Sequence, residues 1–328
     1  MNVETINSDN KLASWARFFR LHTLLPTALI PIISYITVKP LGVQSTLTII
    51  YFAGLAHIFT CGLNDLVDYP IDKNAEDKQH RPLVSGEIDI WNAKYVLTFI
   101  LMLSIFPAFF VSVKLVALMI VGLALSTAYN ILSGVKVYAD FIYVSSILAI
   151  FAVGPVIAGG YTKVTLLLFG AFVIHGFYQV QEGHMKDLVE DENNILQRLG
   201  LDVNPDRSVS YPKWFTGATL SLKLLEFSLI SYAVLIINPA NLQTVIGPLL
   251  SVLGLIYLVS TSMWLMPVFD RDAIVKWITI HELASIVTIL IAVYSLDTAY
   301  VAFFIVATPL WLIVTNYFIH DDILSPDI

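Results

Sequence analysis

The sequence Asn64-Asp65-Leu66-Val67-Asp68-Tyr69-Pro70-Ile71-Asp72 ends a long apolar stretch of the chain. A second apolar stretch ends in another acidic run, His184-Met185-Lys186-Asp187-Leu188-Val189-Glu190-Asp191. Carboxylates at the margin of a lipid bilayer are costly unless they face water or bind a positive partner. Two such runs therefore indicate membrane helices that share one cation site.

The composition is that of a membrane protein. Of the 328 residues, 57% are hydrophobic and 13% are charged, against about 25% charged in a soluble domain. Apolar stretches long enough to span a bilayer, about 18–20 residues, recur along the chain. They cover residues 23–39, 43–65, 91–113, 115–134, 139–161, 164–185, 214–238, 243–267, 273–295 and 297–320. We therefore expect an all-α polytopic membrane bundle of about nine to ten transmembrane helices, with the stretch 273–295 either spanning or partly a re-entrant or interfacial helix.

Lysine and arginine are concentrated in alternate loops, and such loops are usually cytoplasmic. The expected cytoplasmic set is Lys11, Arg17, Arg20, Lys73, Lys78, Arg81, Lys136, Lys186, Arg198, Arg207, Lys213, Arg271 and Lys276. The opposite side keeps only Lys39, Lys114 and Lys163. Because an even number of spans separates the two acidic runs, both are expected on the cytoplasmic face. The net charge of −7 and the lack of a basic tract do not suggest a nucleic-acid partner.

The spacing of the acidic residues points to a divalent cation. Asn64, Asp68 and Asp72 are four residues apart and would share one face of a continuing helix. Pro70 disturbs the hydrogen bond to the carbonyl of Leu66, so the helix is expected to kink or end there. Hard oxygen ligands without nearby Cys or paired His suit Mg2+ better than zinc.

Mg2+ commonly uses one or two carboxylates together with waters and a substrate phosphate. This coordination preference indicates a diphosphate substrate. The nearby bases that would balance its charge are Lys73, Lys78, Arg81, Lys136 and Lys186. Arginine is suited to bidentate phosphate contact.

The motifs also carry a family resemblance. Asn64-Asp-x-x-Asp68-x-x-x-Asp72, followed by Arg81-Pro-Leu-x-Ser-Gly86, looks like the first signature of the UbiA superfamily of intramembrane prenyltransferases. The stretch from Glu182 to Asp191, followed by Leu199-Gly200, resembles that family's second aspartate motif. The resemblance covers nearly the whole chain, so residues 1–328 are expected to form a single domain with motif loops at about 64–90 and 184–213. It implies a helical bundle around a central cavity that opens to the cytoplasmic face and to lipid.

The resemblance implies a reaction as well. Mg2+ and an isoprenyl diphosphate would be held by the two motifs, and the prenyl group would pass to a lipophilic or aromatic acceptor. The implied metal ligands are Asn64, Asp68, Asp72, Asp187 and Asp191, of which the four aspartates are the implied catalytic residues. The implied diphosphate-binding residues are Lys73, Lys78, Arg81, Lys136 and Lys186.

The chain departs from the family pattern at specific positions. His184 stands where many members have a third acid in the second motif. Asp77 occupies a position that is basic in some aromatic prenyltransferases, with Lys78 next to it. The tenth apolar stretch also exceeds the nine spans that are usual in the family.

Other polar residues lie near the proposed site. Ionisable groups inside membrane spans often mark functional sites, and the alternative is hydrogen bonding between helices. The residues predicted to line the cavity are Arg20, Tyr129, His175, Tyr178, Gln179, Glu182 and His184. For Arg20, anchoring at the cytoplasmic interface is the alternative.

Two other functions remain open at this stage. A terpene cyclase of the same superfamily would act on an isoprenyl diphosphate without an acceptor. A transporter would use the acids as a cation path, but transporter sites usually lie near the bilayer midplane, whereas these acids cluster at one side. The acceptor and the length of the prenyl chain are not encoded in a recognisable motif.

Overall fold

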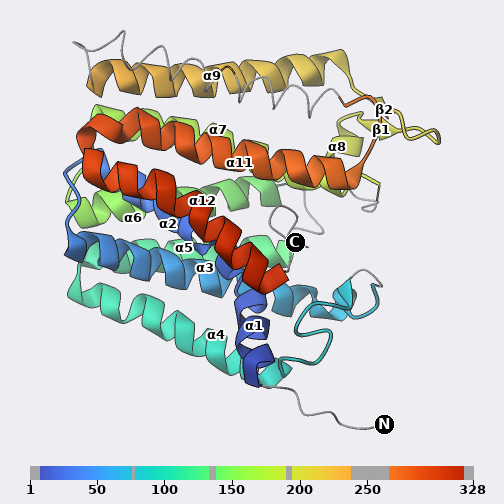
Figure 1. Cartoon of the computed structure of the whole chain (residues 1–328), viewed down its shortest axis with the longest axis horizontal. Coiled ribbons are helices and arrows are strands. Elements are labelled where there is room, and N and C mark those ends of the chain that lie inside the picture. Colours follow the sequence, from blue (N-terminus) through green and yellow to red (C-terminus); the bar gives the residue numbers. More distant parts are fainter. Residues whose placement is uncertain are drawn as a thin grey trace.

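The computed structural model describes residues 8–75, 78–132, 138–189, 194–237, 254 and 266–320. Within these ranges the chain is almost entirely helical, and Figure 1 shows the long helices running roughly alongside one another. The elements are α1 (Ser8–Phe18), η1 (Leu21–Thr23), α2 (Leu24–Ile36), α3 (Val43–Asp72), α4 (Ile90–Ile105), η3 (Pro107–Phe110), α5 (Val113–Leu132), α6 (Ala139–Ala158), α7 (Lys163–Lys186), α8 (Ile195–Arg198), β1 (Asp202–Val203), β2 (Val209–Ser210), α9 (Lys213–Ile237), α11 (Arg271–Val293), η4 (Tyr294–Leu296) and α12 (Thr298–His320). The two strands form one antiparallel hairpin in which Asp202 pairs with Ser210.

The spans expected from hydropathy are present in the described parts of the chain. Eight of the described helices are long and apolar enough to cross a membrane, and a ninth candidate is the pair formed by α1 with η1 and α2, bent by 56°. The stretch 273–295 is a continuous helix, α11. The stretch 243–267 lies almost entirely outside the described residues. The protein is therefore an integral, multi-pass membrane protein of the all-α class.

The acidic run of the first motif forms the last turns of α3. Asn64, Asp68 and Asp72 all lie in this helix, so the predicted common face is confirmed. The helix continues through Pro70 and ends two residues later, at Asp72. The expected end at the proline is therefore two residues too early, because one missing N–H does not by itself stop a helix that has nearly reached its last turn.

Helix α2 packs closely against α6 because a glycine faces it. A Cβ atom at Gly154 would lie only 2.2 Å from the carbonyl oxygen of Pro31 and 2.2 Å from Oγ of Ser34. Ser34 also donates a hydrogen bond of 2.6 Å to the carbonyl of Phe151. Small residues that allow close helix approach are a general feature of membrane bundles. This contact holds α2, and with it the preceding Arg20, against the rest of the bundle.

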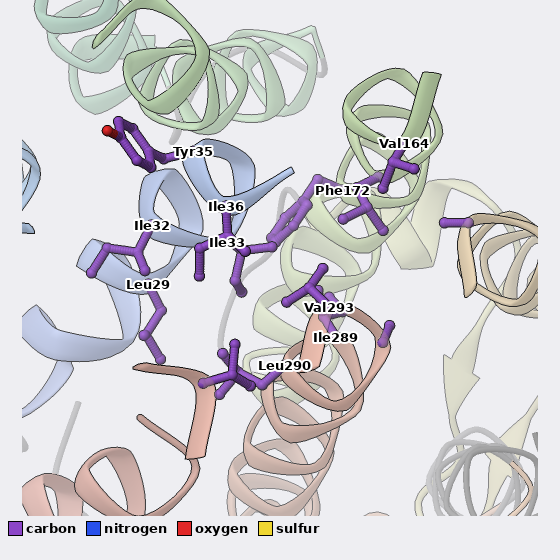
Figure 2. Close-up of a cluster of buried hydrophobic side chains, with 14 of the residues drawn as sticks. Leu29, Ile32, Ile33, Tyr35, Ile36, Val164, Phe172, Ile289, Leu290 and Val293 are labelled. Atoms are coloured by element: carbon purple, nitrogen blue, oxygen red, sulfur yellow. The ribbon is translucent and has the colours of Figure 1, made fainter. Parts of the chain in front are cut away.

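One end of the bundle is held together by apolar side chains. Figure 2 shows most of these side chains gathered between α2, α7 and α11, with Tyr35 turned towards a neighbouring helix, and the labelled ones are Leu29, Ile32, Ile33, Tyr35, Ile36, Val164, Phe172, Ile289, Leu290 and Val293. They come from the last turns of α2, the first half of α7 and the end of α11. This packing aligns α7 and α11 in opposite directions, so that the polar end of α7 meets the start of α11.

Candidate active site

The first motif forms a row of oxygen atoms along the end of α3. The amide of Asn64 donates a hydrogen bond of 3.0 Å to Oδ2 of Asp68, one turn further along the helix. Asp65 and Asp72 are buried, whereas the side chain of Asp68 is 31% exposed. The row therefore offers one carboxylate to solvent or ligand and keeps two within the protein.

Two arginines hold this row from different parts of the chain. Nη2 of Arg20 lies 2.9 Å from Oδ1 of Asn64 and 3.1 Å from Oδ1 of Asp65. Nη1 of Arg81 pairs with Asp72 and also lies 3.8 Å from Oδ1 of Asp65 and 4.0 Å from Oδ2 of Asp68. Three carboxylates thus face two guanidinium groups, which leaves one negative charge for an additional cation.

The position of Arg20 is set by the break between α1 and η1. Its backbone adopts the left-handed conformation, with φ 47°, which residues other than glycine rarely adopt. Its carbonyl oxygen lies 3.2 Å from Nε2 of His57, a buried residue of α3. The bend between the two helices therefore directs the guanidinium of Arg20 onto the acidic row.

The second motif covers the last turn of α7, which ends at Lys186, and the residues that follow it. Oδ1 of Asp187 lies 3.6 Å from Nη2 of Arg271, the first residue of α11, and the Asp187 side chain is 39% exposed. His184 is directed to α6, where its Nε2 lies 3.2 Å from Oδ1 of Asp140. The carbonyl of His184 accepts a hydrogen bond of 2.6 Å from the amide of Asn194. Asp191, the other predicted ligand of this motif, lies outside the described residues.

The two motifs meet at the same end of the bundle, where α3 and α7 both terminate (Figure 1). Lys186 at the end of α7 is near enough to Arg20 and Lys78, on the side of the first motif, to be repelled by their positive charges. Tyr129 of α5 lies within electrostatic range of both Asp68 and Asp140. The predicted bases are thus partly gathered between the motifs, with Lys73 exposed just after α3. Lys136 lies outside the described residues.

Comparison with known proteins identifies the family. The sequence profile of the UbiA prenyltransferase family matches residues 24–277, most of the chain. The chain belongs to the UbiA prenyltransferase family. It is therefore an intramembrane enzyme of the prenyltransferase type. No curated protein sequence matches it significantly.

Solved structures of UbiA homologues have the same fold. A homologue from Archaeoglobus fulgidus bound to DMAPP and Mg2+ matches with a TM-score of 0.64 at 14% identity, covering 87% of this chain and 99% of the other. A homologue from Aeropyrum pernix K1 without ligand matches with a TM-score of 0.58 at 14% identity, covering 83% and 95%. A structure described as digeranylgeranylglyceryl phosphate synthase in membranes matches with a TM-score of 0.57 at 16% identity, covering 88% and 99%.

The motif residues of this UbiA family member suit a hard cation such as Mg2+. Their donors are carboxylate and amide oxygens, and Asp68 and Asp187 remain accessible. Among the described residues, the motif carboxylates do not form a ready-made cluster of three ligand groups. Mg2+ does not need one, because it usually takes one or two carboxylates and completes its shell with phosphate oxygens and water. The donor set therefore fits Mg2+ that arrives with a diphosphate.

The polar residues in the second half of α7 have partners on neighbouring helices. Gln179 lies between Tyr143 and Glu282, and its amide donates a hydrogen bond of 2.8 Å to Oε2 of Glu282. The hydroxyl of Tyr178 donates to the carbonyl of Thr219 on α9. The rings of Tyr129 and Tyr143 are 4.9 Å apart. A chain of polar groups thus extends from the neighbourhood of Asp68 into the bundle.

Several residues of the site were not singled out by sequence reasoning. Asp65 stands within the quoted motif but breaks the four-residue spacing, and only its contact with Arg20 reveals its place. Asp140 was overlooked because it is a lone acid at the start of α6, far in sequence from His184. No pattern within α6 alone indicates that this acid faces the second motif.

Proposed function

We propose that this protein is a Mg2+-dependent prenyltransferase that moves an isoprenyl group from an isoprenyl diphosphate to a lipophilic or aromatic acceptor. The observation that carries the proposal is the meeting of two acidic motifs with Arg20, Arg81 and Lys186 at one end of a membrane bundle. Acids with interleaved bases suit a cation together with a polyanion, which is the composition of a Mg2+–diphosphate. Because Lys and Arg are concentrated on this side, we place its opening at the cytoplasmic face.

The described residues would divide the work as follows. Asp68 and Asp187, which remain accessible, would hold Mg2+ together with Asn64 and Asp191, and Mg2+ when bound neutralises charge on the departing diphosphate. Asp72, also in the predicted ligand set, is buried against Arg81 and would bind the metal by exchanging that ion pair. The bases would contact the diphosphate oxygens, the predicted set being Lys73, Lys78, Arg81, Lys136 and Lys186. Arg20 is already engaged with Asn64 and Asp65, so its proposed role is to position the ligand Asn64 and to neutralise the buried Asp65.

The reaction breaks the allylic C–O bond and leaves its electron pair on diphosphate. The acceptor then forms a bond to the allylic carbon and loses a proton, for which we propose Asp191 as the receiving carboxylate. Tyr129, near Asp68, is suited to stabilise positive charge on the prenyl group through its ring. Apolar helices around the tail would exclude water that would otherwise capture the reactive carbon.

Two solved relatives support the choice of substrate. One homologue from Archaeoglobus fulgidus is bound to DMAPP and Mg2+, and another structure from the same organism is bound to GPP and Mg2+. Both are only 14–15% identical to this chain. The proposal therefore rests mainly on the motif residues of this chain and on its family.

The test is prenyl transfer by the purified protein in lipid nanodiscs. A labelled prenyl diphosphate and a panel of acceptors, supplied with and without Mg2+, should give a product only when Mg2+ and a suitable acceptor are present. Asp68→Asn and Asp187→Asn should each lower turnover by at least about 10²–10³-fold, since each removes charge that stabilises the leaving group.

Matched controls are available on the same side of the protein. Glu87 pairs with Arg17 away from the motif acids, and Asp206 is an exposed carboxylate of the β1–β2 turn. Glu87→Gln and Asp206→Asn should keep normal turnover. Full activity in both Asp68→Asn and Asp187→Asn would refute the assignment of the site.

A terpene cyclase is the second candidate, because the second motif has His184 where many family members have an acid. In this chain His184 is engaged with Asp140. Incubation with Mg2+ and a prenyl diphosphate alone separates the two functions. A released hydrocarbon or terpene alcohol would favour the cyclase, whereas turnover that begins only when acceptor is added would favour the transferase.

A further inference from the structure

A cluster of ionisable side chains lies inside the bundle, away from the acidic row of α3. It is formed by α7, α9 and α11, which contact one another (Figure 1). We call it the interior cluster, and its members are His175, Glu182, Lys223, Glu226, His281 and Glu282. Ionisable groups in membrane spans are rare and usually functional. The proposed prenyl transfer assigns none of these residues to the binding of Mg2+ or diphosphate.

One half of the interior cluster is well paired. Nζ of Lys223 lies 2.8 Å from Oε2 of Glu226, whose other oxygen lies 3.3 Å from Nδ1 of His175. Nε2 of His175 lies 3.2 Å from Oε2 of Glu282, and Gln179 donates to the same oxygen. These contacts satisfy Lys223 and Glu226 and one oxygen of Glu282.

The other half leaves buried polar atoms without hydrogen bonds. Glu182 is 1% exposed and His281 is 0% exposed, and Nδ1 of His281 lies 2.6 Å from Oε1 of Glu182. Among the described residues, Oε2 of Glu182, Nε2 of His281 and Oε1 of Glu282 have no hydrogen-bond partner. A buried carboxylate oxygen without a partner is costly. A cation bound between these atoms would offset the free-energy cost of burying them.

The charges lead to the same conclusion. The interior cluster sets three glutamates against one lysine and two histidines, so negative charge is in excess unless both imidazoles are protonated. One ligand atom from each of Glu182, His281 and Glu282 lies within 4.8 Å of the others. A divalent cation at this position would balance the charge and bind the unpartnered oxygens.

We propose that Glu182, His281 and Glu282 form a metal site, distinct from the Mg2+–diphosphate motifs, for a divalent transition ion such as Zn2+. One imidazole nitrogen and two carboxylate oxygens match the ligands that Zn2+ takes in proteins. The imidazole makes the set less suitable for Mg2+, which prefers oxygen ligands and water. Because metal ligands must be deprotonated, the site takes Glu182 and Glu282 as carboxylates and His281 as a neutral imidazole.

The site would join α7 to α11 close to the second motif. Glu182 precedes Asp187 by little more than one helical turn, and Arg271 at the start of α11 contacts Asp187. A metal bridge between Glu182 and α11 would therefore fix the end of α7 from which Asp187 projects. This is a positioning role, and the metal site itself does not depend on the identity of the prenyl acceptor.

The experiment measures metal binding directly. Untagged protein in nanodiscs is treated with EDTA, then loaded with Co2+ or Zn2+ in the presence of millimolar Mg2+, which competes at the diphosphate motifs. Elemental analysis is expected to find one tightly bound metal ion per protein molecule. Bound Co2+ should show visible absorption typical of a low-coordinate site, and X-ray absorption of bound Zn2+ should show scattering from an imidazole.

The variants separate this site from the motifs. His281→Gln and Glu182→Gln should each lose the tightly bound metal ion and the visible absorption of bound Co2+. They should also lose the rise in Tm that metal binding gives to the unsubstituted protein. Asp68→Asn, which alters the first motif, should keep all three. Glu282→Gln serves as a further variant if either of the others fails to fold.

Two results would overturn the proposal. The first is the absence of a tightly bound metal ion in the unsubstituted protein, which would leave the interior cluster as a network of ion pairs. The second is metal that is retained in His281→Gln but lost in Asp68→Asn, which would place binding at the acidic row. Loss of prenyl transfer is not used as a readout, so the metal site and the proposed reaction can fail separately.

Discussion

The acidic ends of α3 and α7 are built in different ways. At the end of α3, Asp65 and Asp72 are buried and held by two arginines that come from other parts of the chain. At the end of α7, the side chain of Asp187 is 39% exposed and its contact with Arg271 is 3.6 Å long. Removing one partner of a buried ion pair strongly destabilises the folded protein. An exposed ion pair contributes only about 0–1 kcal/mol to the free energy of unfolding.

This difference suggests a division of labour between the two motifs. The first motif is arranged by the protein itself, because the guanidinium groups hold its oxygens in place before any ligand binds. The second motif offers a more open carboxylate whose position depends on the ends of α7 and α11. Substitution of Arg81, Arg20 and Arg271 by alanine should therefore lower the rate of prenyl transfer by different amounts.

The largest effect is expected from Arg81→Ala. The guanidinium of Arg81 pairs with Asp72 and lies near Asp65 and Asp68, so its removal leaves several carboxylates facing one another. We expect kcat/KM for prenyl transfer to fall by about 10²–10³-fold, together with a loss of about 3–5 kcal/mol of stability. Turnover assays and thermal unfolding in nanodiscs measure both effects.

The variant Arg81→Lys separates charge from geometry. Lysine keeps the positive charge but cannot make the planar bidentate contact, so an intermediate activity is expected. Normal activity and stability in Arg81→Ala would show that the first motif is not organised by this arginine.

A smaller effect is expected from Arg20→Ala. Arg20 contacts Asn64 and Asp65 from the break between α1 and η1, while Arg81 would still face the row. We expect kcat/KM to fall by about 10-fold, which corresponds to about 1.4 kcal/mol. A Mg2+ titration of activity should shift to higher concentration, because Asn64 loses the contact that orients it. An unchanged Mg2+ dependence would argue against this positioning role.

The smallest effect is expected from Arg271→Ala. The contact with Asp187 is long and exposed, so its loss should change kcat/KM by only about two- to five-fold. Because salt screens exposed charges, the difference from the unsubstituted protein should shrink at high ionic strength. Assays at two salt concentrations check this. An effect as large as that of Arg81→Ala would mean that the second motif is as tightly organised as the first.

The sequence already contained much of the fold and part of the site. Apolar stretches predicted the described spans, and the four-residue spacing placed Asn64, Asp68 and Asp72 on one face of α3. These predictions succeeded because membrane hydropathy and helical periodicity are local properties of the chain. Asp65 escaped notice because its importance comes from Arg20, a residue that spacing within α3 does not reveal.

Hydropathy and motif spacing were sufficient to indicate a membrane bundle with two acidic motifs, since both signals lie along contiguous segments, and the resemblance of those motifs to a known family indicated the prenyltransferase activity. The partners of the charges came from tertiary packing alone. It brought Arg81 to Asp72, Asp140 to His184, and Glu182 to His281. Coulombic and metal-ligand interactions depend on distances of a few ångströms between atoms, and only the packed helices set those distances.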